Sequence, residues 1–135
     1  MPQTKTTERL KNERGQTMAE LTLVLPVLLV LLLGIAQFGV TFNNYVSLTD
    51  AVRAGARKAA VSRNLSDPAA ACRQQVVDSR GGLDKTELEE NLSCISSWDP
   101  GAPVTVSADY PYEIKLLNWS VKSGRFISTM KERVE

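Results

Sequence analysis

Residues 21–36 read LTLVLPVLLVLLLGIA, without an ionisable side chain, and low polarity continues as far as Phe42. From Leu21 to Phe42 the apolar stretch is 22 residues long, which exceeds the ~20 helical residues needed to cross the hydrocarbon core of a bilayer. A chain of 135 residues is one domain's worth at most. Its remainder could hardly wrap a helix that is apolar on every side, since a buried helix in a small domain normally keeps one polar face. A soluble single domain is therefore largely excluded.

The helical pattern continues beyond the apolar stretch. Apolar and small side chains recur every three or four residues, while charged side chains fall on another face. The recurring residues are Tyr45, Leu48, Val52, Gly55, Ala56 and Ala59. No proline interrupts the chain between Pro26 and Pro68. The sequence therefore predicts one helix from about Thr17 to Ser62, ~70 Å long at 1.5 Å per residue, apolar all round in its first half and amphipathic in its second.

A cleaved secretory signal and an ordinary membrane anchor are alternative interpretations of this stretch. A secretory signal has an apolar region of about 7 to 15 residues before a small-x-small cleavage site, and Gly34-Ile35-Ala36 fits such a site. Cleavage there would separate the amphipathic half of the helix from its membrane attachment. Charge alone leaves the orientation open, because basic residues flank both ends of the stretch.

The charge of the chain is unevenly distributed. Residues 1–15 carry four basic and two acidic side chains, whereas the other 120 residues carry 12 basic and 13 acidic ones, a net charge of −1. Near-neutrality outside the first segment argues against a nucleic-acid partner, which requires a basic face. The chain has no histidine, which excludes histidine-based catalysis and disfavours most metal sites. No cofactor and no enzymatic activity are expected.

A short basic segment ends in glycine just before the apolar stretch, in Arg14-Gly15-Gln16-Thr17-Met18-Ala19-Glu20-Leu21. Four uncharged residues follow the glycine, and a carboxylate stands at the fifth position. This junction resembles that of a class of prepilins, which an inner-membrane aspartyl peptidase cuts after the glycine on the cytoplasmic face. The resemblance implies a leader over 1–15, a cut between Gly15 and Gln16, and a mature chain of 120 residues.

The carboxylate of Glu20 has two possible roles. At the start of a membrane helix it benefits from unpaired N–H groups and from the positive end of the helix dipole. It can simply cap the helix and reach the headgroups. Alternatively, it pairs with the α-ammonium that cleavage creates at Gln16, within one helix or between neighbours. Taken together with Gly15 and the leader, Glu20 is assigned to assembly, where it sets the register against a neighbour's amino terminus.

Three further residues are assigned to packing of the membrane helix. Pro26 removes one helix hydrogen bond and predicts a gentle kink, although membrane helices also tolerate a proline that has no role. Gly34 and Gly39 permit the close approach of another helix.

Over a longer range the sequence resembles the TadE-like family, minor pseudopilins of the tight-adherence (Flp-type) pilus apparatus. The strong part of the resemblance lies in 14–60, and a weaker part in 103–135; Leu21 departs from it, where these motifs often carry an aromatic. The matching segments are Gly15–Pro26, Leu31–Gly34, Phe38-Gly39, Asp50–Arg57, Val104-Thr105-Val106, Tyr110-Pro111-Tyr112 and Arg133-Val134-Glu135.

Beyond Arg63 the composition predicts a small exported domain. Asp67-Pro68 is an N-cap followed by proline, which begins a helix over 69–80 that Gly81-Gly82 stops. Asp84 with Glu87 resembles a capping box that opens a shorter helix toward Asn91.

Alternation of apolar and polar residues then predicts strands over 104–110 and 112–116, with a poorer third strand over 126–134. We expect them to form an antiparallel sheet on the amphipathic end of the long helix, burying the tyrosines and either Trp98 or Trp119. The predicted fold class is therefore α+β: a leader (1–15), a transmembrane helix (16–42), its amphipathic continuation (43–63) and a small pilin-like domain (64–135).

Two cysteines, Cys72 and Cys94, lie beyond the membrane segment. On an oxidising side of the membrane, an even pair is most simply a disulfide. The alternative is two buried, reduced thiols.

The leading interpretation is a non-enzymatic minor pilin-like subunit with a cytoplasmic amino terminus and an extracytoplasmic carboxy-terminal domain, held in the inner or plasma membrane. The partners implied by the resemblance are a prepilin peptidase, another minor pseudopilin, the major pilin and the inner-membrane assembly platform; membrane lipid surrounds the helix. An unprocessed single-pass protein whose outer domain binds a ligand or envelope component is the alternative. A hydrolase displayed outside the membrane has no recognisable motif to support it.

Overall fold

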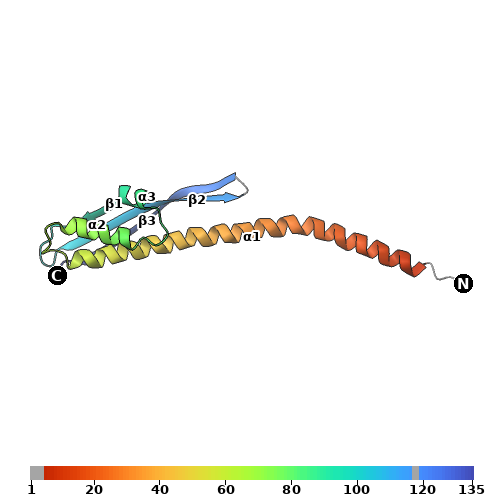
Figure 1. Cartoon of the computed structure of the whole chain (residues 1–135), viewed down its shortest axis with the longest axis horizontal. Helices are drawn as coiled ribbons and strands as arrows, with labels where there is room; N and C mark the ends of the chain where they lie inside the picture. The colour runs from red at the N-terminus through yellow and green to blue at the C-terminus, as the bar shows by residue number, and fades with distance from the viewer. Residues whose placement is uncertain (1–4, 117–118) are drawn as a thin grey trace. The chain divides into compact units, whose positions relative to one another are not determined.

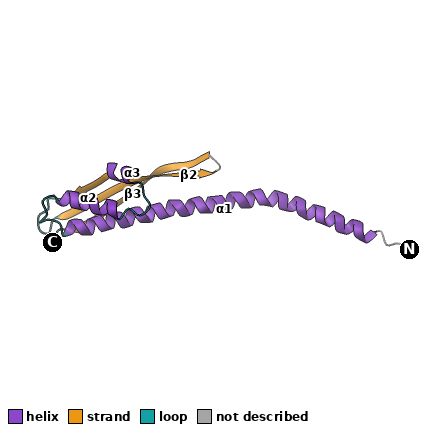
Figure 2. Cartoon of the chain, in the orientation of Figure 1, coloured by secondary structure: helices purple, strands orange, loops and turns teal. Residues whose placement is uncertain are grey.

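The computed structural model describes residues 5–116 and 119–135, so the first four residues of the predicted leader lie outside the described part. The three strands form one antiparallel sheet in the order β1-β2-β3. Figures 1 and 2 show the elements, which are α1 (Lys5–Ala60), α2 (Pro68–Asp78), α3 (Lys85–Glu90), β1 (Leu92–Ile95), β2 (Pro103–Leu116) and β3 (Trp119–Arg133). A long apolar helix followed by short helices and a three-stranded antiparallel sheet confirms the predicted α+β class.

The chain divides into two compact units, Met1–Gln37 and Phe38–Glu135. The second unit includes the amphipathic part of α1, because this part supplies one wall of the hydrophobic core. The buried residues that α1 contributes are Leu48, Ala51, Val52, Ala56 and Ala59. The amide N–H of Glu135 donates to the carbonyl of Ala60 at 2.9 Å, which fastens the end of the chain to the end of α1.

A glycine in α1 makes room for α2. A Cβ atom built on Gly55 would lie 2.2 Å from Cγ2 of Val76 and 3.4 Å from the carbonyl oxygen of Cys72. Both of these residues are fully buried. The close approach of the two helices therefore requires glycine at this position.

The N-caps of α2 and α3 are the two aspartates that the sequence predicted. The carboxylate of Asp67 accepts a hydrogen bond from the amide of Ala70 at 2.8 Å, and α2 ends at Asp78, ahead of Gly81, whose φ of 62° is left-handed. At α3, Asp84 accepts from the amides of Thr86 and Glu87.

The predicted capping box at α3 has a different second half. The amide N–H of Asp84 donates to the hydroxyl of Tyr110 at 3.1 Å, the position that a capping box gives to the Glu87 carboxylate. This hydrogen bond ties α3 to β2.

The predicted pair of strands over 104–110 and 112–116 is wrong, because β2 runs unbroken through Pro111. Strand β1 pairs only with Thr105–Ala108, so on that side β2 has an open edge at Pro111. A proline is tolerated at an open edge, where its missing N–H removes no ladder bond. Strand β3 correspondingly begins at Trp119, earlier than the predicted 126.

Strand β1 was not predicted. It has four residues, of which only Cys94 is buried, and so shows no alternation long enough to read. Its place at the sheet edge is fixed by two contacts of Cys94: the backbone register with Val106 and a bond to Cys72. The two Sγ atoms are 2.08 Å apart, and the disulfide joins α2 to β1.

Replacing Gly55 by alanine is expected to destabilise the globular unit by about 1–3 kcal/mol, because the added methyl overpacks the contact with Val76. Chemical unfolding of the detergent-solubilised chain, followed by the circular dichroism of the sheet, measures the effect. Gly39→Ala is the matched control, since a Cβ at Gly39 meets nothing within 4 Å. Equal stability of the two variants would contradict the packing role of Gly55.

Loss of the disulfide is expected to lower the free energy of unfolding by roughly 3 kcal/mol, because the link restricts the unfolded chain between the two cysteines. The measurement compares the untreated chain, the reduced chain and the Cys72→Ala/Cys94→Ala variant in the same unfolding assay. Thiol titration of the untreated, denatured chain serves as the control and should find no free thiol. Two free thiols would contradict the link.

Candidate functional site

The predicted processing and assembly residues lie on neighbouring turns inside α1, which begins earlier, at Lys5. Nε2 of Gln16 donates to Oε1 of Glu20 at 3.2 Å, an i,i+4 contact on the exposed surface of α1. Residues 16 and 20 therefore share one helix face. A charge placed at residue 16 would lie within reach of the Glu20 carboxylate.

Gly15 stands one residue before this pair, and its peptide bond to Gln16 lies inside α1. A Cβ at Gly15 would meet nothing within 4 Å, so packing within the chain does not require glycine there. Glycine weakens a helix by about 1 kcal/mol relative to alanine. Its presence lowers the cost of unwinding the backbone at this peptide bond.

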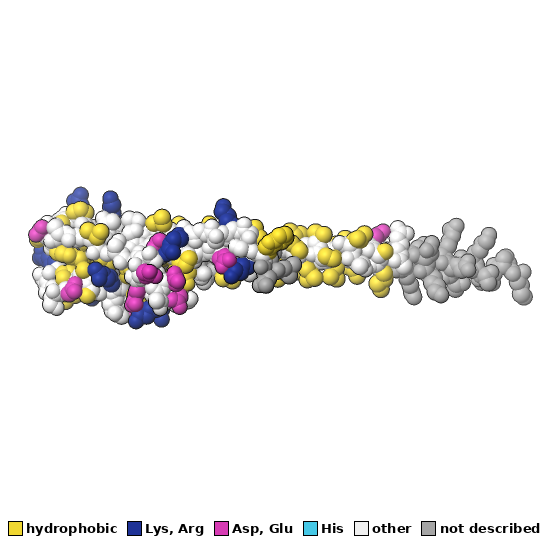
Figure 3. Space-filling view, turned by 90° about the horizontal axis from the view of Figure 1, so that it is seen from above, with side chains coloured by type: hydrophobic (Ala, Val, Ile, Leu, Met, Phe, Trp, Pro, Cys, Tyr) yellow, Lys and Arg dark blue, Asp and Glu magenta, His cyan; other side chains and the backbone are white. Residues whose placement is uncertain are grey.

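The apolar stretch that follows is exposed on all sides. Exposure of its large side chains reaches 76% at Leu23 and 70% at Ile35, and Figure 3 shows apolar side chains gathered along this helix on the face in view. Such a surface far exceeds the scattered apolar residues of a soluble monomer. The helix is long and apolar enough to cross a membrane, which indicates a membrane-anchored protein.

The residues assigned to helix packing lie on the open surface of α1. Within the first unit, α1 bends in the orange part of Figure 1, which contains Pro26. Pro26 and its neighbours line a shallow apolar depression. Cβ atoms at Gly34 or Gly39 would meet nothing within 4 Å, so each glycine leaves a gap on the helix surface.

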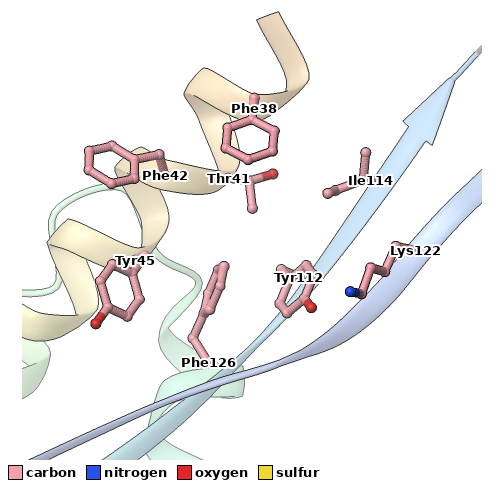
Figure 4. Close-up of a pocket in the computed structure, with 8 residues that line it drawn as sticks. All are labelled: Phe38, Thr41, Phe42, Tyr45, Tyr112, Ile114, Lys122 and Phe126. Atoms are coloured by element: carbon pink, nitrogen blue, oxygen red, sulfur yellow. The ribbon is translucent and has the colours of Figure 1, made fainter. Parts of the chain in front are cut away.

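An aromatic cavity in the second unit was not predicted. It has a volume of about 430 Å³ between α1 and the β2–β3 hairpin, and Figure 4 shows the side chains around it. The lining residues are Phe38, Thr41, Phe42, Tyr45, Tyr112, Ile114, Lys122 and Phe126. We call this space the aromatic cavity.

Ring contacts build the inner wall of the aromatic cavity. Phe126 meets Tyr45 edge-on, with ring centroids 5.3 Å apart, and stacks on Tyr112 at 4.3 Å. Tyr112 in turn covers Gly124, where a Cβ would lie 2.8 Å from its hydroxyl oxygen. The rings are thus held in place by the register of the hairpin.

The predicted burial of the aromatic residues is therefore partly wrong. Tyr45, predicted to be buried, is 42% exposed. Of the two tryptophans offered as alternatives, Trp98 packs against the core and Trp119 is 82% exposed. The rings of Tyr45 and Tyr112 close one side of the cavity instead of filling the core. The aromatic spacing along α1 at Phe38, Phe42 and Tyr45 was the one signal in the sequence that marked this face.

Charged residues of the hairpin form two ion pairs. Nε of Arg125 donates to Oδ2 of Asp109 at 2.6 Å, and this hydrogen bond raises the pKa of Arg125. Nζ of Lys115 lies 2.8 Å from Oε2 of Glu113, and the hydrogen bond from Lys115 lowers the pKa of Glu113. Among the described side chains, those of 15–115 and 119–135, no three cysteine or carboxylate groups gather as metal ligands would.

The family model of TadE-like proteins matches residues 15–57. The match begins at Gly15 and covers Glu20, the apolar stretch and the start of the amphipathic part of α1. No curated protein and no solved structure gives a significant match. A TadE-like segment implies a function connected with tight-adherence pili. The match confirms the predicted resemblance: residues 15–57 of the chain are similar to TadE-like proteins.

Proposed function

We propose that the protein is a minor pilin-like subunit, without enzymatic activity, that takes part in assembly of a tight-adherence type IV pilus. The observation that carries this proposal is the position of the family match, which begins at Gly15. The matched segment contains a glycine, then a carboxylate, then an exposed apolar helix. Processing of a pilin-like subunit requires the glycine, and its packing in the membrane requires the carboxylate and the helix.

In this proposal the amino terminus lies in the cytoplasm and the unit that carries the sheet lies outside the membrane. The disulfide between Cys72 and Cys94 supports that orientation, because disulfides persist in oxidising compartments. The proposed partners are a prepilin peptidase, a second minor pseudopilin, the major pilin and the inner-membrane platform. The gaps at Gly34 and Gly39 are suited to close packing by neighbouring helices.

Glu20 is proposed to set the register of that packing. An unpaired carboxylate is costly in a membrane, ~2.5–3.5 kcal/mol at the centre and less near the interface. Cleavage after Gly15 would create an α-ammonium at Gln16, whose side chain already contacts Glu20 at 3.2 Å. The new cation can pair with Glu20 of the same chain or of a neighbour, and either pairing relieves the cost.

Cleavage is tested by the mass and amino-terminal sequence of the membrane-bound protein, expressed together with its prepilin peptidase. The mature chain is expected to begin at Gln16. Gly15→Leu should leave the chain uncleaved, because a bulky side chain at this position blocks recognition and favours the helix. Gly39→Ala is the control and should be cleaved normally. An intact Met1 in the unaltered chain would contradict processing.

Glu20→Ala is expected to lower recovery of the assembled complex severalfold, because a neighbour's amino terminus loses its counter-charge. Crosslinking of membrane-bound subunits, followed by affinity capture, measures assembly. Thr22→Val is the matched control: it removes a side-chain hydrogen bond to the Met18 carbonyl in the same part of the helix without changing the charge. Normal assembly of the Glu20→Ala chain would refute the pairing.

A second candidate is an unprocessed single-pass protein whose outer domain binds an envelope component. The observation in favour of this second function is the open aromatic cavity, which is a place for a ligand to bind. The same amino-terminal determination separates the two functions, since the second requires an uncleaved chain.

A further inference from the structure

The aromatic cavity lies at the end of the apolar stretch. Two of its lining residues, Phe38 and Phe42, are the last aromatic side chains of that stretch, and both are more than 60% exposed. A membrane that takes up the stretch therefore reaches the mouth of the aromatic cavity. The cavity lies within the second unit, so its geometry is independent of the first.

The hairpin runs back along the part of α1 that follows Phe38. Near the start of β2 the chain end is bonded to Ala60, midway the ring of Phe126 meets Tyr45, and farther on Ile114 lies at the cavity with Phe38. Strand β2 therefore runs from the Ala60 end of α1 toward Phe38, antiparallel to this part of the helix.

Trp119 lies farther along the same hairpin. It pairs with residue 116, two positions beyond Ile114, which adds about 7 Å at the rise of a strand. Its side chain is 82% exposed. Tryptophan is enriched at membrane–water interfaces, where its ring lies at the level of the headgroups.

One cation lies at the aromatic cavity. Lys122 is part of the lining, and Figure 4 shows its amino group turned toward Tyr112. Among the residues whose placement is described, no carboxylate comes within ion-pair distance of Lys122, whereas Lys115 is paired with Glu113. An apolar cavity with an unpaired cation matches a ligand that has an apolar body and an anionic group.

We propose that the aromatic cavity binds an anionic phospholipid of the membrane that α1 enters. The acyl and glycerol part of the lipid packs against the aromatic walls, Lys122 binds its phosphate, and Trp119 enters the headgroup layer beside it. The volume of about 430 Å³ is in the range of ligand pockets and holds part of one lipid. This inference rests on membrane anchoring of α1 and not on the role in pilus assembly.

The first test places the full chain in nanodiscs that hold one copy each, made of phosphatidylglycerol and phosphatidylethanolamine. Trp98→Phe leaves Trp119 as the only tryptophan. Its fluorescence should be quenched by lipids brominated near the headgroup and protected from aqueous acrylamide. Trp119→Phe, which leaves only Trp98, is the control and should show no lipid quenching. Acrylamide quenching of Trp119 without lipid quenching would overturn the proposal, and so would shielding from both quenchers.

The second test measures phosphatidylglycerol retained on the otherwise unaltered chain by native mass spectrometry, with phosphatidylcholine as the reference lipid. Lys122→Gln should lower phosphatidylglycerol binding about fivefold, the effect of one lysine at an anionic membrane surface. Lys115→Gln is the matched control, because Lys115 is already paired with Glu113. Equal losses in both variants, or equal retention of the two lipids, would overturn the proposal. Amino-terminal processing is unaffected by either result, so the two proposals fail separately.

Discussion

The structure depends on one constraint, the removal of the apolar surface of residues 21–42 from water. The large apolar side chains of this helix that the structure describes stay exposed, and a membrane is the environment that removes them from water. The consequences extend in both directions along the chain. Before the helix stand Gly15 and Glu20, where processing and charge pairing are proposed, and after it stands a disulfide-bonded unit whose chemistry suits an oxidising side.

The globular unit is small, and α1 supplies part of its hydrophobic core. Leu48 and Val52 of α1 are fully buried against residues of α2 and the sheet. Val76 packs directly against the backbone of Gly55, where a Cβ atom would lie only 2.2 Å from its Cγ2. Domains of this size bury too little surface to be very stable. The disulfide between Cys72 and Cys94 therefore contributes a substantial part of the stability.

Local signals in the sequence predicted the parts of the fold that local physics determines. The apolar stretch predicted most of α1, although the helix begins at Lys5 and not at the predicted Thr17. Asp67 predicted the start of α2 because an N-cap acts on its own helix. Strand β1 escaped prediction, since its position depends on pairing with β2 and on Cys94. Pro111 was misread as a break, although the alternation of side chains continues through it from Val104 to Ile114. The aromatic cavity escaped for a related reason: α1 and the hairpin meet there only through the register of β2 and β3.

We propose that α1 crosses the membrane and places the sheet-bearing unit outside the cytoplasm. The direct test is protease accessibility in intact spheroplasts or protoplasts, in which separate antibodies follow the amino terminus and the carboxy terminus. If α1 has this orientation, protease added outside removes the carboxy-terminal epitope and leaves a membrane-protected fragment containing the apolar stretch. Protection of the carboxy-terminal epitope until the membrane is dissolved by detergent would contradict it.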